Sequence, residues 1–237
     1  MIKILMGDGD IGYKILMLLQ TLVIVLIALT VHEVAHGWTA SKLGDDTAKK
    51  QGRLSLNPLK HLDPFGFLSM LLFGFGWANP VPIRAGRFKH PKLGMAVSAL
   101  AGPVANLLLA VFAWLIVETI IKLAPMDVYL AYAGYTNASE EILFAVNMLT
   151  VSIEFFATFH YLNLSLAVFN FIPVPPLDGS RVLYSFLPDK LYFGVMKYEQ
   201  IISMVLVVLL VSDILDNPLV WIVEKVSAGI DFIIPII

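Results

Sequence analysis

The sequence has no cysteine and few charged residues. None of its 237 residues is Cys, and only 14% are Asp, Glu, Lys or Arg. Without Cys there can be no disulfide bond, no catalytic thiol and no thiolate metal ligand, so a metal would have to be held by His, Asp or Glu. An ordinary soluble domain is about one quarter charged, so this chain has too few polar side chains to cover a globule. The net charge of −2 gives no general attraction to nucleic acid, and we expect no nucleic-acid partner.

Hydrophobic residues, in contrast, make up 58% of the chain, with 15 Phe, 8 Tyr and 4 Trp. This composition excludes intrinsic disorder and indicates a lipid bilayer as the surrounding medium. Apolar stretches about as long as a membrane crossing, or somewhat shorter, occupy residues 11–30, 95–121, 142–171 and 201–211. We therefore predict an all-α polytopic membrane protein with about four transmembrane helices, forming one domain over residues 1–237. The apolar tail, residues 218–237, contains three charged residues, and it would lie in the interface or form a short fifth span.

A shorter apolar run lies between the first two predicted spans. Residues 65–77 are too few to cross a bilayer, and Gly66, Gly74 and Gly76 disfavour a helix there. The sequence predicts a re-entrant segment, covered by protein or facing a water-filled cavity. A small β element is expected somewhere within residues 52–90.

The basic residues predict the orientation of the spans. Nine of the sixteen Lys and Arg residues lie within residues 38–94, whereas residues 123–141 contain three acidic residues and no basic one. By the positive-inside rule the first connection is cytoplasmic and the second is outside. We expect a multi-pass protein of the plasma membrane with its amino terminus outside.

The pentapeptide His32-Glu33-Val34-Ala35-His36 is an H-E-x-x-H motif that continues the first apolar stretch. On a helix its two His side chains lie one turn apart on one face, as two imidazole ligands of one Zn²⁺ require. Glu33 lies about 100° further round the helix, within reach of a water on the metal. Zn²⁺ lowers the pKa of such a water to about 7, and a carboxylate can accept its proton. The alternative is a cytoplasmic helix end whose His and Glu lie at the membrane interface.

A zinc protease needs a third protein ligand, and Asp178 is the best candidate. Residues 173–176 include three prolines, which cannot continue a helix, so the third span must end near residue 171. The chain then returns to the cytoplasmic side, where the first helix places its two His. The alternative is a rigid turn in which Asp178 and Gly179 are ordinary turn formers.

Other ionisable residues in or near the apolar stretches are weaker candidates for chemistry. Glu118 and Glu154 fall near the outer ends of their spans, which favours an interfacial location. His160 lies in the middle of a span, where a hydrogen bond between helices is expected. His61 and His90 lie in the basic connection and are expected at the surface.

Four segments in this order resemble the site-2 protease family of intramembrane zinc metalloproteases. They are the H-E-x-x-H motif, the Asn-to-Gly segment 170–179, and the intermediate segments 52–64 and 101–106. The resemblance covers about residues 15–190 and is that of a compact, prokaryotic-type member without a PDZ insertion.

The resemblance implies a three-helix catalytic core with one Zn²⁺ per chain. The metal would be held by His32, His36 and Asp178, with Glu33 as the catalytic base. Asn170 would line the substrate site or stabilise an oxyanion.

Residues 66–77 would correspond to the family's membrane-embedded β-loop, which could pair with an unwound substrate strand. The implied function is endopeptidase cleavage within or near transmembrane segments of other membrane proteins, with the active site toward the cytoplasm. A prenylated-protein protease is a second hypothesis, but the sequence lacks that class's further paired Glu and His ligands. A membrane transporter or chaperone that binds metal without proteolysis is the third.

Overall fold

The fold is built around three long helices. The computed structural model describes residues 10–73, 76–132, 134, 139–212 and 214–234. The long helices are α2 (Ile11–Lys42), α5 (Pro91–Leu123) and α7 (Glu140–Phe171). Shorter segments follow or connect them: α3 (Thr47–Lys50), η1 (Pro58–Lys60), α4 (Pro64–Phe73), η2 (Ala85–Arg87), α6 (Met126–Tyr132), α8 (Asp178–Ser185), α9 (Asp189–Met196), α10 (Glu199–Val211) and α11 (Asp216–Ile233).

Local sequence explains where the long helices begin and end. Asp10 caps α2 by accepting a hydrogen bond from the backbone N–H of Tyr13 at 3.0 Å. Pro91 opens α5 in the first turn, where a missing N–H costs nothing. α7 ends at Phe171, directly before the proline-rich segment, so the predicted end of the third span is confirmed.

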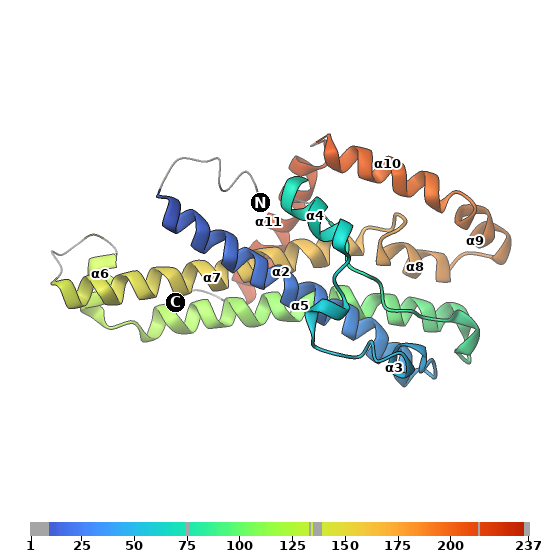
Figure 1. Cartoon of the computed structure of the whole chain (residues 1–237), viewed down its shortest axis with the longest axis horizontal. Coiled ribbons are helices and arrows are strands. Elements are labelled where there is room, and N and C mark those ends of the chain that lie inside the picture. The colour runs from blue at the N-terminus through green and yellow to red at the C-terminus, as the bar shows by residue number, and fades with distance from the viewer. Residues whose placement is uncertain (1–9, 74–75, 133, 135–138, 213, 235–237) are drawn as a thin grey trace.

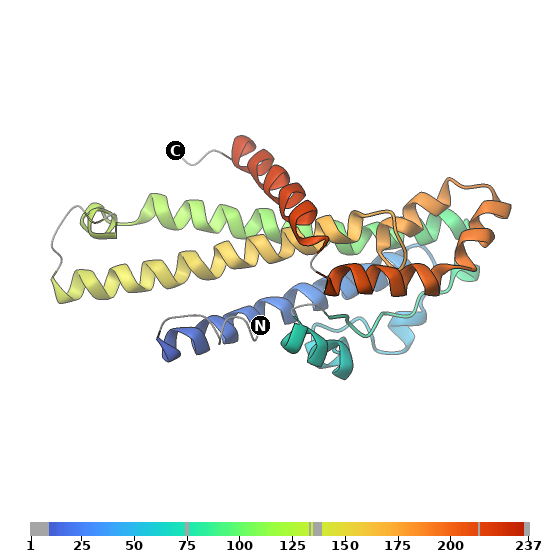
Figure 2. The same ribbon diagram turned by 90° about the horizontal axis from the view of Figure 1, so that it is seen from above.

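The long helices form an elongated bundle. α5 and α7 run antiparallel side by side, and α2 crosses them over part of their length (Figures 1 and 2). Ile24 of α2, Ala113 of α5 and Phe159 of α7 pack together in one buried cluster. A second cluster joins α5 and α7 to α11 through Ala110, Leu164, Val223 and Ile230. The small alanines allow the helix backbones to approach closely.

The three long helices are long and apolar enough to cross a membrane. They have 32, 33 and 32 residues, and a crossing needs about 20. Large apolar side chains also face outward from them, and Phe112 and Phe144 are 61% and 68% exposed. The expected fourth span is the apolar helix α10, which has only 13 residues.

The prediction of a helix-free segment at residues 65–77 is wrong for its first part. Residues 64–73 form α4, whereas Gly74 lies outside the described residues. Gly66 is in the first turn of α4, where its N–H donates to Asp63 Oδ1 at 2.7 Å, so it does not interrupt the helix. Its missing side chain serves close approach, because a Cβ there would lie 2.1 Å from the carbonyl oxygen of Trp77.

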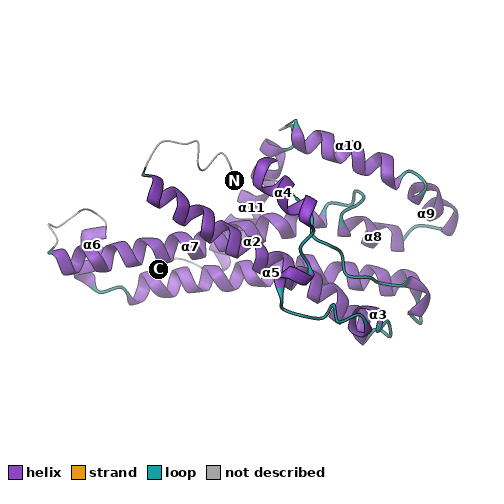
Figure 3. Ribbon diagram, in the orientation of Figure 1, coloured by secondary structure: helices purple, strands orange, loops and turns teal. Residues whose placement is uncertain are grey.

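The expected β element is reduced to one antiparallel bridge between Leu62 and Ala78. The N–H of Asn79 donates to the carbonyl of His61 at 2.7 Å beside it. No strand occurs among the described residues (Figure 3). The bridge nevertheless fixes the extended segment that follows α4 against the start of that helix.

Candidate metal centre

Three side chains that can bind a metal meet where α2 passes the start of α8. His32 and His36 lie on α2, and Asp178 is the first residue of α8. Asp178 Oδ2 lies 3.1 Å from His32 Nε2 and 3.2 Å from His36 Nε2. One ligand atom from each residue lies within 4.8 Å of the other two. The structure thus brings the two histidines together with the aspartate expected from the proline-rich turn.

Two glycines leave the space that this cluster needs. A Cβ on Gly102 of α5 would lie 2.5 Å from His36 Nε2 and 2.6 Å from His32 Cε1. A Cβ on Gly179 would lie 2.3 Å from the carbonyl oxygen of Phe171. All three distances are far inside van der Waals contact, so only glycine allows α5 to pack on the imidazoles and α8 to begin against the end of α7.

The Nδ1 atoms of both histidines are bound to acceptors. His36 Nδ1 lies 2.7 Å from the carbonyl oxygen of Ser98, which can only accept, so Nδ1 carries the proton. His32 Nδ1 lies 2.5 Å from Asn106 Oδ1. The amide nitrogen of Asn106 donates to the carbonyl of Ala28 at 3.2 Å, which assigns its oxygen to the His32 side. The lone pair of each imidazole is therefore on Nε2, toward Asp178.

This donor set fits Zn²⁺. Two imidazole nitrogens and one carboxylate are the protein ligands of a zinc-hydrolase site that leaves a position open. Hydrogen bonds from the far ring nitrogens to carbonyl oxygens are typical of metal-binding histidines.

Glu33 is buried and is held by a different segment of the chain. Its Oε2 accepts a hydrogen bond of 2.7 Å from the backbone N–H of Val81. Pro80 and Pro82 flank Val81 and have no N–H, so Val81 provides the one backbone donor of this stretch. Glu33 Oε1 makes no hydrogen bond with the described residues. The carboxylate is thus fixed through one oxygen and available through the other.

Comparison with known proteins agrees with this cluster. Residues 20–212 match the sequence profile described as "Peptidase family M50". The chain belongs to peptidase family M50. This is the site-2 protease family that the sequence motifs resemble, so the protein is a metallopeptidase.

Bacterial relatives of this M50 peptidase are matched over most of its length. It is 38% identical over 223 residues to "Putative zinc metalloprotease YwhC" of Bacillus subtilis, covering 94% of this chain and 93% of that protein. It is 28% identical over 212 residues to "Putative zinc metalloprotease Rip2" of Mycolicibacterium smegmatis, covering 87% and 71%. The Mycobacterium tuberculosis H37Rv protein of the same name is 27% identical over 197 residues, covering 81% and 66%. No solved structure matches this chain significantly.

Asn170 lies in the last turn of α7 but is not bonded to the metal-binding cluster. Its amide nitrogen donates to the carbonyl of Leu166 in the preceding turn, at 2.9 Å. This is a bond within its own helix. Its role toward substrate stays a prediction.

The structure of this M50 peptidase adds supporting groups that the sequence did not single out. The Ser98 carbonyl and the Val81 N–H are backbone groups, which carry no sequence signal. Asn163 is fully buried and accepts a 2.9 Å hydrogen bond from Asn106. An amide in the middle of an apolar span was the available signal for it.

Asp45 is a further supporting residue, and it is fully buried. It accepts hydrogen bonds from the N–H and hydroxyl of Thr47 and, at 2.5 Å, from the N–H of Arg84. Arg87 Nε lies 3.8 Å from it. Burial raises the pKa of Asp45, but the hydrogen bonds from Arg84 and Thr47 lower it by more, so its pKa lies below the usual value. Asp45 therefore ties the turn after α2 to the segment three residues beyond Val81.

Two other histidines, His160 and His61, make structural hydrogen bonds. His160 bonds the Ala110 carbonyl through Nδ1 at 2.9 Å and Ser227 through Nε2 at 3.2 Å, which confirms the predicted helix–helix role. The prediction that His61 lies at the surface is wrong, because it is 1% exposed and its Nε2 bonds the Ser55 carbonyl at 2.8 Å.

Proposed function

We propose that this M50 peptidase is a zinc-dependent intramembrane endopeptidase. Its substrates would be membrane proteins, cleaved within or near their transmembrane segments in regulated intramembrane proteolysis. The observation that carries the proposal is that His32 and His36 of α2 meet Asp178 of α8. Of these two helices, α2 is the one that is long and apolar enough to cross a bilayer. A hydrolase site on a membrane-spanning helix is accessible to membrane-embedded peptides.

Each residue of the cluster has a role in this proposal. His32, His36 and Asp178 hold one Zn²⁺, which when bound lowers the pKa of water and polarises a peptide carbonyl. Glu33 Oε1 accepts a proton from the attacking water while Val81 holds Oε2. Hydrolysis then breaks the peptide C–N bond. The water oxygen goes to the carbonyl carbon and the proton from Glu33 goes to the leaving nitrogen. Asn170 contributes a substrate or oxyanion contact.

The membrane arrangement is also a proposal. With the amino terminus outside, α2, α5 and α7 cross in alternation as the three-helix core, and the cluster lies toward the cytoplasmic side of the plasma membrane. α10 returns along the long axis and α11 continues beyond it at an angle (Figure 2). These two helices together would form a broken fourth crossing, since α10 alone is too short. The lipid bilayer and a transmembrane protein substrate are the partners, and nucleic acid is not.

The test is cleavage of a transmembrane substrate by the purified chain in detergent or nanodiscs, with zinc measured in every preparation. Glu33→Gln should keep zinc and lose proteolysis, whereas His36→Ala should lose both. A Glu33→Gln variant with full proteolysis would overturn the assignment. A wild-type chain that binds zinc but cleaves no membrane substrate would favour a transporter or chaperone.

The topology has its own test. A reporter fused after residue 130 should read outside the cell, and one within residues 44–57 should read cytoplasmic. A cytoplasmic signal after residue 130 would contradict the proposed orientation.

A further inference from the structure

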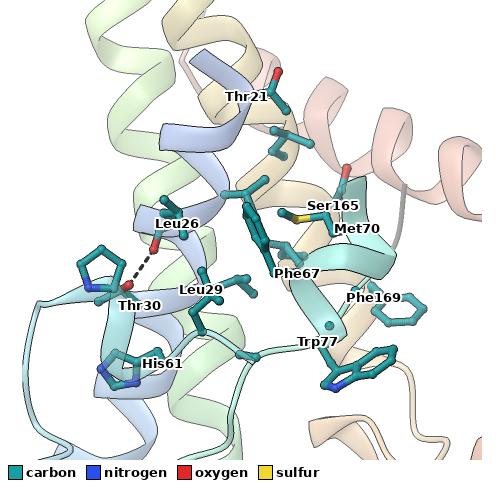
Figure 4. Close-up of a pocket in the computed structure, with 18 of the residues that line it drawn as sticks. Thr21, Leu26, Leu29, Thr30, His61, Phe67, Met70, Trp77, Ser165 and Phe169 are labelled. Atoms are coloured by element: carbon teal, nitrogen blue, oxygen red, sulfur yellow. Dashed lines mark hydrogen bonds between the residues drawn. The ribbon is translucent and has the colours of Figure 1, made fainter. Parts of the chain in front are cut away.

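An apolar cavity of about 440 Å³ lies between α2 and α7. Its walls include Leu26 and Leu29 of α2, Phe67 and Met70 of α4, and Leu166 and Phe169 of α7 (Figure 4). The first turns of α11 also contribute to it. Its volume is in the range of small-ligand pockets, about 300–1,000 Å³.

Two separate segments lead from this cavity to Glu33. On α2, Leu29 and Thr30 line the cavity, and Glu33 follows at helical spacings of four and three residues, on the same face one turn further. In the extended segment after α4, Trp77 and Ala78 line the cavity, and the N–H of Val81 then binds Glu33. Both lining segments therefore continue directly from the cavity wall, one to the proposed catalytic base and the other to the N–H that binds it.

The lining determines the chemistry of the occupant. Most of the wall is hydrophobic, and the Thr30 hydroxyl is already bonded to the Leu26 carbonyl at 2.6 Å (Figure 4). The α2 residues of the wall belong to a candidate membrane span. An occupant must therefore be apolar and embedded in the membrane, which a lipid chain and a transmembrane substrate both satisfy.

Distance along the backbone favours the substrate. One helical turn, about 5.4 Å, separates the cavity residues Leu29 and Thr30 from Glu33. An extended peptide advances about 3.3 Å per residue. A peptide whose scissile bond lies at Glu33 would therefore place its first or second neighbouring residue at the cavity.

We propose that this cavity is the specificity pocket for one or two large apolar side chains beside the scissile bond. They would lie on the side of the cut that faces the membrane interior. The inference rests on the proposed function and adds a selectivity to it: substrates with Phe, Leu or Met at these positions bind better than those with Ala.

Filling the cavity tests the selectivity. Ser165→Phe adds a ring to the α7 wall, and Ser152→Phe makes the same change on α7 outside the cavity. We expect Ser165→Phe to reduce the preference in kcat/KM for a Phe over an Ala substrate at least about tenfold, the scale of hydrophobic pocket discrimination. Ser152→Phe should leave that preference unchanged, and Met70→Ala should shift it toward still larger side chains. An unchanged ratio in both Ser165→Phe and Met70→Ala would overturn the proposal.

A photo-crosslinking amino acid at Phe67, combined with Glu33→Gln, identifies the occupant without turnover. The expected product joins the enzyme to the substrate residues beside the cut. Cross-links only to lipid, or only to a second copy of the chain, would overturn the proposal. If the wild-type chain cleaves no substrate, the proposed function fails. If it cleaves, but the cavity variants leave the preference for Phe over Ala unchanged and no cross-link to the substrate forms, only this inference fails.

Discussion

The amide of Asn106 donates to Oδ1 of Asn163 over 2.9 Å, between two fully buried side chains of α5 and α7. Asn163 in turn donates to the carbonyl of Phe159 at 2.9 Å. Since a backbone carbonyl can only accept, this last bond fixes the direction of the whole chain of hydrogen bonds. Asn106 must present its oxygen to His32, and His32 must present its Nε2 lone pair to the metal site. A residue of α7 thus acts together with the Ala28 carbonyl to orient the amide that positions an α2 histidine.

Replacing Asn163 should weaken zinc binding. Asn163→Leu removes one of the two acceptors that orient the Asn106 amide, and loss of such a supporting contact typically lowers metal affinity about 10- to 100-fold. Competition with a chelator measures the affinity. Thr150→Val is the matched control on α7, because within the described part of the chain the Thr150 hydroxyl bonds only its own helix. Wild-type zinc affinity in a folded Asn163→Leu chain would contradict this relay.

Gly102→Ala should disrupt the histidine pair. The added methyl group would lie 2.5 Å from His36 Nε2, so the rings must move or α5 must shift. We expect at least about a tenfold loss in zinc affinity. Gly229→Ala is the control, since no atom lies within 4 Å of a Cβ there, and it should raise stability by about 0.4–1 kcal/mol. Full zinc binding in Gly102→Ala would show that α5 can shift to accommodate the methyl group without disturbing the histidines.

Asp45 should make stability depend on pH in the acidic range. Its pKa is lower in the folded chain than the ordinary 3.8, so its ionised form stabilises the fold above that value. This contribution is lost as the pH falls through the folded pKa. Asp45→Asn should cost roughly 1.5–3 kcal/mol at neutral pH, the scale of a hydrogen bond to a charged group.

Thermal unfolding in detergent between about pH 3 and pH 7 measures the effect of Asp45. The difference between wild type and Asp45→Asn should shrink toward low pH. Asp127→Asn, which changes an exposed acid of α6, should alter neither the stability at neutral pH nor its dependence on pH. A constant difference across the range would exclude ionised Asp45 as the cause.

Asn170→Ala should retain zinc but lose roughly 10- to 1,000-fold in rate, as expected for one polar contact to substrate or transition state. Among the described residues its amide bonds only its own helix, so its removal should not disturb the cluster. Single-turnover cleavage and zinc content are the measurements. Wild-type turnover would remove Asn170 from the site.

Substrates with Gly or Pro near the cut should be cleaved faster than fully helical ones. A helix holds each carbonyl in an intrahelical hydrogen bond, and Gly and Pro disfavour that structure by about 1 and 3 kcal/mol. Initial rates on a substrate and its Pro variant decide this. Equal rates would mean that unwinding is not limiting.

The sequence predicted the cluster of metal-binding side chains because its signals, a helical spacing and a proline-rich helix end, are local in the chain. His32 and His36 are related by one helical turn, and the prolines before Asp178 end α7 wherever it packs. The His61 environment and the helix at residues 64–73 were mispredicted, because both depend on the return of residues 76–79 along the start of α4. Gly66 illustrates the difficulty. In the sequence this glycine indicated a break in a helix, whereas in the structure its missing side chain makes room for the Trp77 carbonyl.

The proposed ligand set also has a consequence for how the protein is made. Asp178 lies 142 residues after His36 in the chain, beyond the end of the last long helix. A nascent chain therefore carries a two-histidine site throughout the synthesis and insertion of α5 and α7. It would gain the third proposed ligand only when α8 emerges and Gly179 packs against Phe171. Proteolytic competence would then switch on after the core has assembled, and a ribosome-stalled chain that ends before α8 should bind zinc weakly and leave neighbouring membrane proteins uncut.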